Sequence, residues 1–434
     1  MLSIFRGSCT TAAIEAVALD VREVSDIVDA LVDKSLVQVD ASKNEPRYRL
    51  LEVVRDFARE QLASRDELRA RHAMYYSGVV AAAKPPYFDL DDEVPNVRDA
   101  LDWHLANEVG GAGRFIADLA PYWRARGAVN EARAWIRRAL EILKPGGSDR
   151  AFLLRLAATF ATLQDALAES LAFSEEALSI YRAAGDRAGI AHAVFRIAEA
   201  KHRQGRIPEA EALYREALDG FIAAGDARGE MLCLGNLGGL AFERRDFHRA
   251  SELLGDAISR AASLGEERIE GDFSIAMGWV ALRLDDLDRA RSLFEKTLAQ
   301  KAAARDRYGE CSARHGLGTV ALMESNDAEA LEQFVAVLNM ARELELTDHI
   351  VRALHGIAAV RGHAGNVEAA VNLLGLADRL SVERGHELRN NVAYEVANQL
   401  LEAALPEPRL SQLRDEGSCL QLDDLTTDQL LRGR

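Results

Sequence analysis

The chain has 434 residues, which is enough to bury a large core or to stack many small units. Hydrophobic residues make up 48% and charged residues 28%, a composition that excludes a disordered chain. A net charge of −16 repels a phosphate backbone, so binding of nucleic acid would need a local basic patch. No apolar run reaches about 18 residues, so we expect no membrane contact and a cytoplasmic location.

The cysteines are spread along the chain with no CxxC pair and no ligand-like spacing: Cys9, Cys233, Cys311 and Cys419. This distribution favours free thiols over disulfides or a zinc site. We expect neither a metal ion nor another cofactor.

Residues 1–64 predict a winged-helix-like region. Two short helices are expected at 11–18 and 25–34, and a third at 51–62. Between the second and third helices, two short strands at 36–39 and 48–50 are joined by a polar turn. Two helices followed by a strand pair are typical of a winged helix.

Helix 25–34 is the one that would enter a DNA groove in such a fold. It carries Asp26, Asp29 and Asp33 against a single Lys34, and residues 1–85 contain 12 basic and 13 acidic side chains. Carboxylates that face phosphates weaken binding. We therefore expect a structural or interdomain role for this region, and no direct contact with nucleic acid.

Self-similarity at a period of 40 residues is the strongest signal in the sequence. A helical linker at 65–150 ends in a degenerate copy, a weaker copy spans 151–190, and clear copies run from 191 to 390. In each clear copy, a small residue follows a large apolar one, and an alanine and then a ring or leucine come later. The columns are Ile197, Leu237, Met277, Leu317 and Ile357; Ala198, Gly238, Gly278, Gly318 and Ala358; Ala210, Ala250, Ala290, Ala330 and Ala370; and Tyr214, Leu254, Phe294, Phe334 and Leu374.

Each column has a reason in helix packing. The small residue lets two helix backbones approach, and the ring or leucine fills the space between them. A glycine suits the left-handed end of a helix, and an acidic residue after it caps the next helix. These pairs stand between copies: Gly185-Asp186, Gly225-Asp226, Gly265-Glu266 and Arg305-Asp306. Each unit is therefore two helices joined by a short turn, and the fold class is all-α.

Residues 391–405 predict a further helix, which Pro406 and Pro408 end. Leucines at 410–413 and 422–431 predict a final helix. We expect residues 391–434 to form the capping helices that keep a solenoid soluble.

The repeat resembles the tetratricopeptide repeat family, whose pattern is matched by Leu237, Gly238, Ala250, Leu254 and Ala257. The period of 40 residues departs from the 34 that is usual in that family. The resemblance implies a right-handed superhelical solenoid over 151–390.

Parts of the first hundred residues resemble the winged-helix region of large bacterial signal-transduction (STAND) ATPases, as found in LuxR-type regulators. The resemblance is carried by 2–5, 31–37, 48–60 and 94–103, the last with Asn96-Val97-Arg98. In that family an NTP-binding domain precedes the winged helix, but no Gly-Lys dipeptide of a phosphate-binding loop occurs here. Since Met1 falls inside the family's first helix, the region is expected to be truncated at its start. We interpret the chain as a C-terminal regulatory portion; a truncated reading frame or a stand-alone remnant is the alternative.

The first helix of each repeat is expected to line a concave face. The family's inward positions give a candidate partner-binding surface made of Phe195, His202, Arg203, Phe242, Trp279, Arg283, His315 and Met323. Rings with modest positive charge suit a protein or peptide partner, or a small-molecule inducer. The alternative is that Phe195, Trp279 and Leu322 only pack between repeats.

No signature of catalysis occurs, so we expect no enzyme. His192 and His202 are 10 residues apart, and His355 and His363 are 8 apart, which is not the i, i+4 spacing of a helical metal site. We interpret these histidines as surface residues.

We expect a non-catalytic regulatory module that binds a protein or ligand and controls transcription together with missing ATPase domains. Two other functions stay open. One is a stand-alone scaffold or adaptor, and the other is a DNA-binding regulator that acts through the winged helix.

Overall fold

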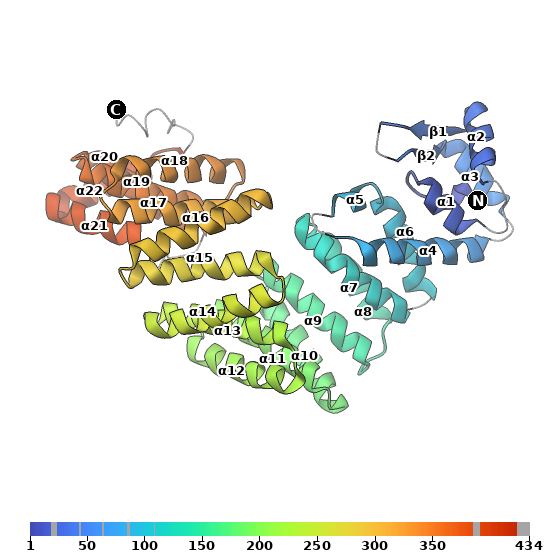
Figure 1. Cartoon of the computed structure of the whole chain (residues 1–434), viewed down its shortest axis with the longest axis horizontal. Helices are drawn as coiled ribbons and strands as arrows, with labels where there is room; N and C mark the ends of the chain where they lie inside the picture. The colour runs from blue at the N-terminus through green and yellow to red at the C-terminus, as the bar shows by residue number, and fades with distance from the viewer. Residues whose placement is uncertain are drawn as a thin grey trace. The chain divides into compact units, whose positions relative to one another are not determined.

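The computed structural model describes residues 1–18, 24–42, 45–62, 65–84, 87–107, 109–384 and 391–422. The chain divides into two compact units, Met1–Ala224 and Gly225–Arg434 (Figure 1). The regular structure of the described residues is helical apart from one two-stranded sheet, which confirms the predicted all-α class. Among these residues, no helix is both long and apolar enough to cross a membrane.

The first part of unit 1 has the predicted order of helices and strands. Its elements are the 3-10 helix η1 (Leu2–Ile4), α1 (Thr11–Val17), α2 (Val24–Asp33), β1 (Val37–Asp40), β2 (Arg47–Leu50) and α3 (Glu52–Glu60). The strands pair antiparallel, with Val37 opposite Leu50 and Asp40 opposite Arg47. Thr10 caps α1 by accepting the backbone N–H of Ala13. This arrangement confirms the predicted winged helix.

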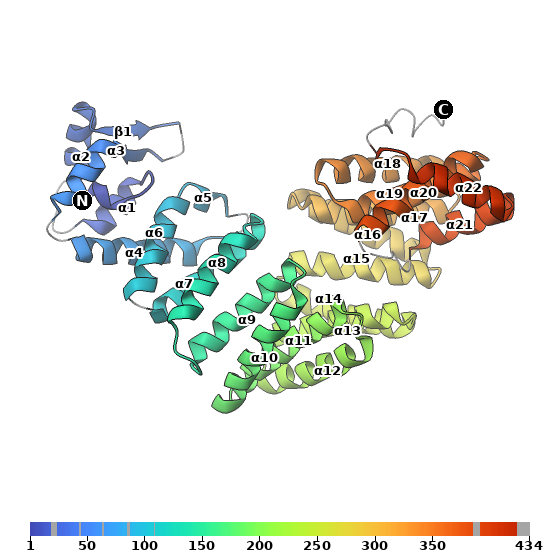
Figure 2. The same cartoon turned by 180° about the vertical axis from the view of Figure 1, so that it is seen from behind.

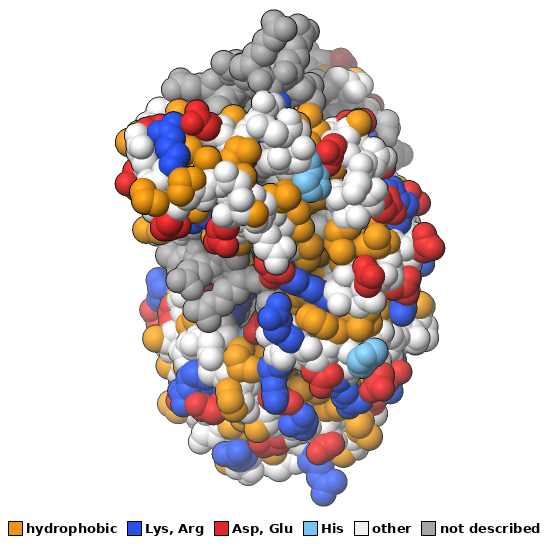
Figure 3. Space-filling model, turned by 90° about the vertical axis from the view of Figure 1, so that its left-hand side faces the viewer, with side chains coloured by type: hydrophobic (Ala, Val, Ile, Leu, Met, Phe, Trp, Pro, Cys, Tyr) orange, Lys and Arg blue, Asp and Glu red, His pale blue; other side chains and the backbone are white. Residues whose placement is uncertain are grey.

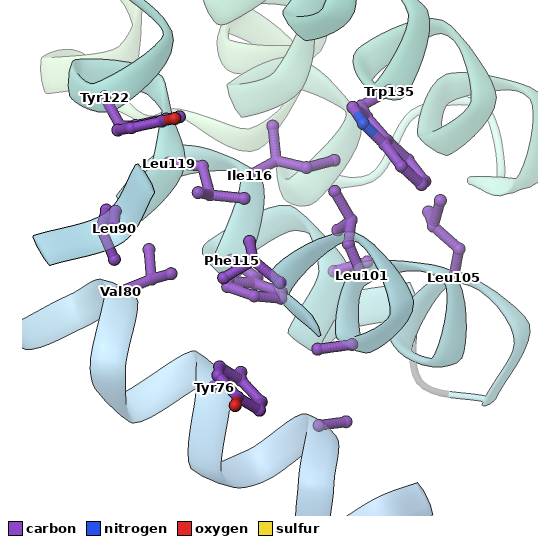
Figure 4. Packing of buried hydrophobic residues seen from close by; sticks show 14 of the residues in the cluster. Tyr76, Val80, Leu90, Leu101, Leu105, Phe115, Ile116, Leu119, Tyr122 and Trp135 are labelled. Carbon is purple, nitrogen blue, oxygen red and sulfur yellow. The ribbon is translucent and has the colours of Figure 1, made fainter. Parts of the chain in front are cut away.

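Five helices connect the winged helix to the repeats: α4 (Arg65–Ala82), α5 (Phe88–Asp91), α6 (Val94–Asn107), α7 (Val109–Ala125) and α8 (Val129–Ile142). Their buried side chains form one cluster that also includes Ile4, Phe5 and Ile14 of the winged helix and Phe160 of the first repeat pair. Figure 4 shows Tyr76, Phe115 and Leu101 within this cluster. The predicted linker is therefore a packed core rather than a spacer.

Helix pairs follow at the predicted spacing. In unit 1 they are α9 (Ser148–Leu163) with α10 (Leu167–Ala184), and α11 (Arg187–Arg203) with α12 (Ile207–Ala224). In unit 2 they are α13 (Ala227–Glu243) with α14 (Phe247–Ser263), α15 (Glu267–Arg283) with α16 (Leu287–Ala303), α17 (Arg307–Met323) with α18 (Asp327–Glu343), and α19 (Thr347–His363) with α20 (Val367–Arg384). The first helices of the clear copies begin at 187, 227, 267, 307 and 347, a step of 40 residues.

The aromatic rings of the second helices pack against the small residues of the first helices. A Cβ placed on Gly278 would lie 2.6 Å from the ring of Phe294, and one on Gly316 of the next first helix would lie 2.5 Å from the same ring. Phe334 is held in the same way between Gly318 and Gly356. Each ring therefore joins its own repeat to the following one.

The turns between pairs have the predicted chemistry at most positions. Gly185 and Gly225 adopt φ of +68° and +69°, and Asp186, Asp226 and Asp306 each accept the backbone N–H three residues later at 2.9–3.0 Å. One position differs from the prediction, because Glu266 makes no side-chain cap. Arg305 adopts the left-handed conformation, with φ of +55°, although it is not a glycine.

Unit 2 ends in α21 (Val392–Ala404) and α22 (Glu407–Ser418). Helix α22 lies close along α20, because a Cβ on Gly375 or Gly417 would come within 2.2 Å of the backbone of the other helix. Helix α21 packs on α19 instead. Nearly all of the helix expected at 422–431 lies outside the described residues.

The contact between Gly278 and Phe294 predicts opposite effects for two helical glycines. Gly278→Ala forces the Phe294 ring to move, so it should destabilise unit 2 by about 1–3 kcal/mol. A Cβ on Gly239 of α13 meets nothing within 4 Å. Gly239→Ala should therefore stabilise unit 2 by about 0.5–1 kcal/mol through helix propensity. Urea unfolding of both variants measures the two signs, and equal effects would contradict the packing described.

Candidate partner-binding surface

Asn96 anchors the beginning of the chain to α6. Its side-chain oxygen accepts the backbone N–H groups of Arg6 and Gly7 at 2.9 and 3.0 Å, and its amide donates to the carbonyl of Ser8 at 2.9 Å. Asn96 is fully buried. The segment that the sequence singled out at 94–103 is therefore the joint between the winged helix and the helices that follow.

A buried ion pair strengthens the same joint. The Arg47 guanidinium of β2 donates to Glu93 at 2.6 Å and to the Ser8 hydroxyl at 2.9 Å. Both charged side chains are about nine-tenths buried. Because removing one partner would strand a buried charge, this pair fixes how the strands sit against α6.

The surface of the winged helix is acidic on one helix and apolar on another. Asp26, Asp29 and Asp33 of α2 are exposed. On α3, Val53 and Phe57 are 84% and 65% exposed. The exposed apolar pair was missed in the sequence, although a spacing of four residues on one helix face is a visible signal.

Unit 1 holds the first three predicted surface residues in different environments. Phe195 is 3% exposed and packs edge-on against Tyr214 at 5.5 Å. His202 is half-buried, with its ring 6.3 Å from that of Tyr214. Arg203 is exposed at the end of α11 and pairs with Asp165 at 3.0 Å. Of the three, Arg203 is the side chain that a partner can reach directly.

The unit 2 residues also divide into buried and accessible groups. His315 is 2% exposed, and its ring lies 5.0 Å from Trp279, which is half-buried. Phe242 and Met323 are half-buried, and Phe242 lies 5.5 Å from Phe247. The rings therefore contribute to packing between helices as well as to the inner surface.

Arg283 is the predicted surface residue with the most specific contact. Its guanidinium donates to both carboxylate oxygens of Glu395 on α21, at 2.6 and 2.8 Å. The hydrogen bond from Arg283 lowers the pKa of Glu395. The predicted partner-binding position is thus filled by a carboxylate of the same chain.

The interpretation of the four histidines as surface residues is wrong for His355. Its side chain is 3% exposed, because the tilted Tyr394 ring packs against it at a centroid distance of 4.8 Å and Asn391 bonds to its Nδ1 at 2.9 Å. His363 is exposed and pairs with Asp327 at 2.8 Å. Nowhere in the described part of the chain do three or more His, Cys, Asp or Glu side chains form a metal-binding group.

Three histidines on the inner helices are buried near one guanidinium. Burial lowers the pKa of His349 to about 4 and that of His355 to about 3. The positive charge of Arg352 is the second cause of both shifts. The same causes hold the pKa of His315 well below its ordinary value. All three rings are therefore neutral at pH 7, and they make this part of unit 2 sensitive to acid.

A cavity of about 400 Å³ lies between α8, α9 and α10 of unit 1. Its lining combines an apolar floor with arginines and glutamates: Ile136, Leu140, Leu154, Ala157, Phe173, Arg133, Arg137, Arg150, Glu141, Glu169 and Glu176. Arg150 is held by Glu176 at 2.7 Å and by the carbonyl of Leu140 at 2.8 Å. This cavity was not predicted from the sequence, because its lining comes from the degenerate copy on α8 and the weaker copy on α9 and α10.

Family comparisons agree with this architecture. Residues 1–63 match the winged helix-turn-helix domain, and 149–223 and 187–263 match the tetratricopeptide repeat. The chain joins a winged helix to tetratricopeptide repeats. Both resemblances seen in the sequence are confirmed at this level. Figure 3 shows that charges of both signs are interspersed over one face of the molecule.

Relatives and solved structures extend the comparison. Proteins from Mycobacterium bovis and two strains of Mycobacterium tuberculosis, provisionally named HTH-type transcriptional regulators, are 32% identical over 225 residues. The match covers 44% of this chain and only 25% of theirs. A STAND protein with a tetratricopeptide repeat sensor from Pyrococcus horikoshii aligns over 96% of this chain and 64% of its own, with a TM-score of 0.64 and 14% identity. At that identity, the likeness shows the fold.

The buried histidines predict a loss of stability in acid. Each folded-state pKa lies below the unfolded value near 6.5, so the unfolded chain binds more protons between pH 6.5 and about 4. Stability should therefore fall as the pH falls through this window, by up to about 1.4 kcal/mol per pH unit for each histidine. Urea unfolding from pH 7 to 4.5 measures the slope. His349→Gln should reduce it by about one histidine's share, and an unchanged slope would contradict the assignment.

Proposed function

We propose that the chain is a regulatory binding module, in which the repeats bind a protein or peptide and the winged helix passes on the bound state. The observation that carries this proposal is the continuous hydrophobic core of unit 1. It contains residues from the winged helix, from all five connecting helices and from the first repeat pair. A change in the packing of the first repeats therefore reaches the winged helix through packed side chains.

The path through that core can be followed from ring to ring. The ring of Phe5 in the winged helix lies 6.4 Å from that of Tyr76 on α4. The His72 ring contacts both, at 5.3 Å from Phe5 and 4.7 Å from Tyr76. Helix α4 packs on α7, and Trp123 of α7 contacts Phe160 of α9 at 6.5 Å. In Figure 4, Tyr76, Phe115 and Ile116 follow one another along this route. Such dense packing transmits displacement rather than absorbing it.

The surface chemistry favours a protein or peptide over DNA. The helix that would read DNA exposes Asp26, Asp29 and Asp33, and carboxylates there oppose phosphate binding. On the first helices of the repeats, Arg203 follows His202 at the end of α11, and Arg283 lies four residues after Trp279 on α15. Arginine beside aromatic rings is a common basis for peptide recognition.

The finer proposal is that this module is the sensor arm of a STAND-type ATPase regulator. It is supported by the fold shared with the STAND protein over nearly all of this chain and by the names of the mycobacterial relatives. The exposed apolar pair Val53 and Phe57 offers the winged helix a contact for a neighbouring ATPase domain. A stand-alone adaptor built from the same repeats is the alternative.

A small-molecule inducer is a second candidate ligand, and the cavity of unit 1 favours it. Its volume of about 400 Å³ falls within the range of small-molecule sites. Apolar lining residues such as Leu154 and Phe173, together with charged side chains of both signs, suit a ligand with an apolar body and a polar group. We propose this cavity as the inducer site if the regulator responds to a metabolite.

A peptide-display selection on the immobilised full chain tests the binding function. We expect a convergent family of acidic peptides, and Arg203→Ala should weaken their binding at least tenfold. Arg215→Ala is the matched control, because Arg215 lies on a second helix, is exposed and pairs with Glu211 of the same helix. Failure to enrich any sequence family, or equal losses in both variants, would contradict the proposal.

A duplex-shift experiment tests the DNA-binding alternative. We expect the purified full chain to leave labelled duplex DNA unshifted at about 0.15 M salt, because the exposed face of α2 is acidic. A shift that disappears with added salt would revive the DNA-binding regulator.

A further inference from the structure

Helix α21 lies across the first helices of three successive repeats of unit 2, on the face that is predicted to be the inner surface. It packs along α19 and touches α17, and Glu395 reaches Arg283 of α15. Figures 1 and 2 show α21 beside α17 and α19 from both sides. The helix thus covers Arg283, one of the predicted partner-binding residues, and touches α17, which carries His315 and Met323.

This position differs from that of a further repeat. In the regular pairs, the two helices pack against each other, and the next first helix packs on the preceding second helix. Helix α22 takes that place on α20, whereas α21 makes little contact with either α20 or α22. Helix α21 therefore packs on the first helices of the solenoid and does not take the place of a further repeat helix.

The buried side of α21 is narrow and consists mostly of small residues. Ala393, Ala397 and Leu401 are buried at a spacing of four residues, which forms one stripe along the helix. Near one end of the stripe, the Tyr394 ring packs against His355. Near the other end, Leu400 and Leu401 lie close to Gly362. A helix with small residues at these positions can lie close against the inner surface.

The polar contacts give this surface its selectivity. Arg283 binds Glu395 through two parallel hydrogen bonds, and the Arg283 side chain is only 11% exposed. Arg245 adds a second positive charge near Glu395, which further lowers the pKa of that carboxyl group. A guanidinium held in a fork accepts a carboxylate and rejects an ammonium group.

We propose that α21 occupies the partner-binding surface of unit 2 as an internal ligand, and that the partner replaces it with an acidic amphipathic helix of the same pattern. This inference rests on the proposed binding function and names the class of partner. The partner's helix carries a carboxylate for Arg283 and small residues where α21 has Ala393 and Ala397. Release of α21 is then part of the response to the partner.

A fluorescent peptide of residues 391–404 tests the proposal against the full chain, by anisotropy. The unmodified chain should bind it weakly, because α21 already fills the surface. Glu395→Lys in the chain expels α21, so the unmodified peptide should bind this variant at least tenfold more tightly. Glu402→Lys is the matched control, because Glu402 is exposed and accepts a hydrogen bond from Asn398 of the same helix. It should bind like the unmodified chain.

A second variant reverses the charge on the other side. Arg283→Glu also expels α21, but its surface should bind the peptide that carries Glu395→Lys and reject the unmodified one. This variant decides the outcome if Glu395→Lys does not fold, as judged by circular dichroism. If neither variant folds, or if the peptide binds all chains equally, α21 is a fixed part of the fold and the proposal is wrong.

The probe is a segment of this chain, so the experiment needs no external partner. If it fails, the display selection still decides the binding function. If the selection fails instead, peptide binding that depends on Arg283 would stand as a property of unit 2 alone.

Discussion

The packing of an aromatic ring against a helical glycine is the contact on which the repeats depend. Phe294 and Phe334 each fill the space left by two glycines, one in their own repeat and one in the next. Because the space closes if any Cβ is added, the distance between neighbouring helices is fixed. The 40-residue period places each of these rings at the same point of its repeat, so both meet the next first helix in the same way.

Fixed spacing of the first helices has a consequence for binding. It leaves inner side chains such as Arg203 and Arg283 at regular positions, where a helix or an extended peptide can contact several repeats at once. In unit 2 that opportunity is already used, because α21 contacts three first helices with one short stripe and one carboxylate. In unit 1 the same regular packing merges with the core of the winged helix. One end of the described chain is therefore suited to exchange a bound helix, and the other is suited to transmit a change.

Local rules made most of the fold predictable from the sequence. The small and ring columns identified every clear repeat, and Asp186, Asp226 and Asp306 cap helices as their spacing indicated. The winged helix was equally visible, because two strands with a polar turn have a short-range signature. Glu266 was the exception, since its longer side chain forms no cap with its own helix.

The candidate site was less predictable because it depends on contacts between distant segments. Arg283 meets Glu395, 112 residues away, and no periodicity reports such a pair. His355 is buried for the same reason, since Tyr394 and Asn391 cover it. The position of a residue on a helix predicts the direction in which its side chain points. It does not predict whether another element covers that side chain.

In the proposed function, the winged helix and the first repeats respond as one body. Native-state hydrogen exchange of the full chain measures this most directly, by the free energy at which the slowest amides of each helix open. We expect one common opening free energy for α1, α4, α7 and α9. If α1 opens at a clearly lower free energy than α9, the winged helix moves independently and the proposed transmission is contradicted.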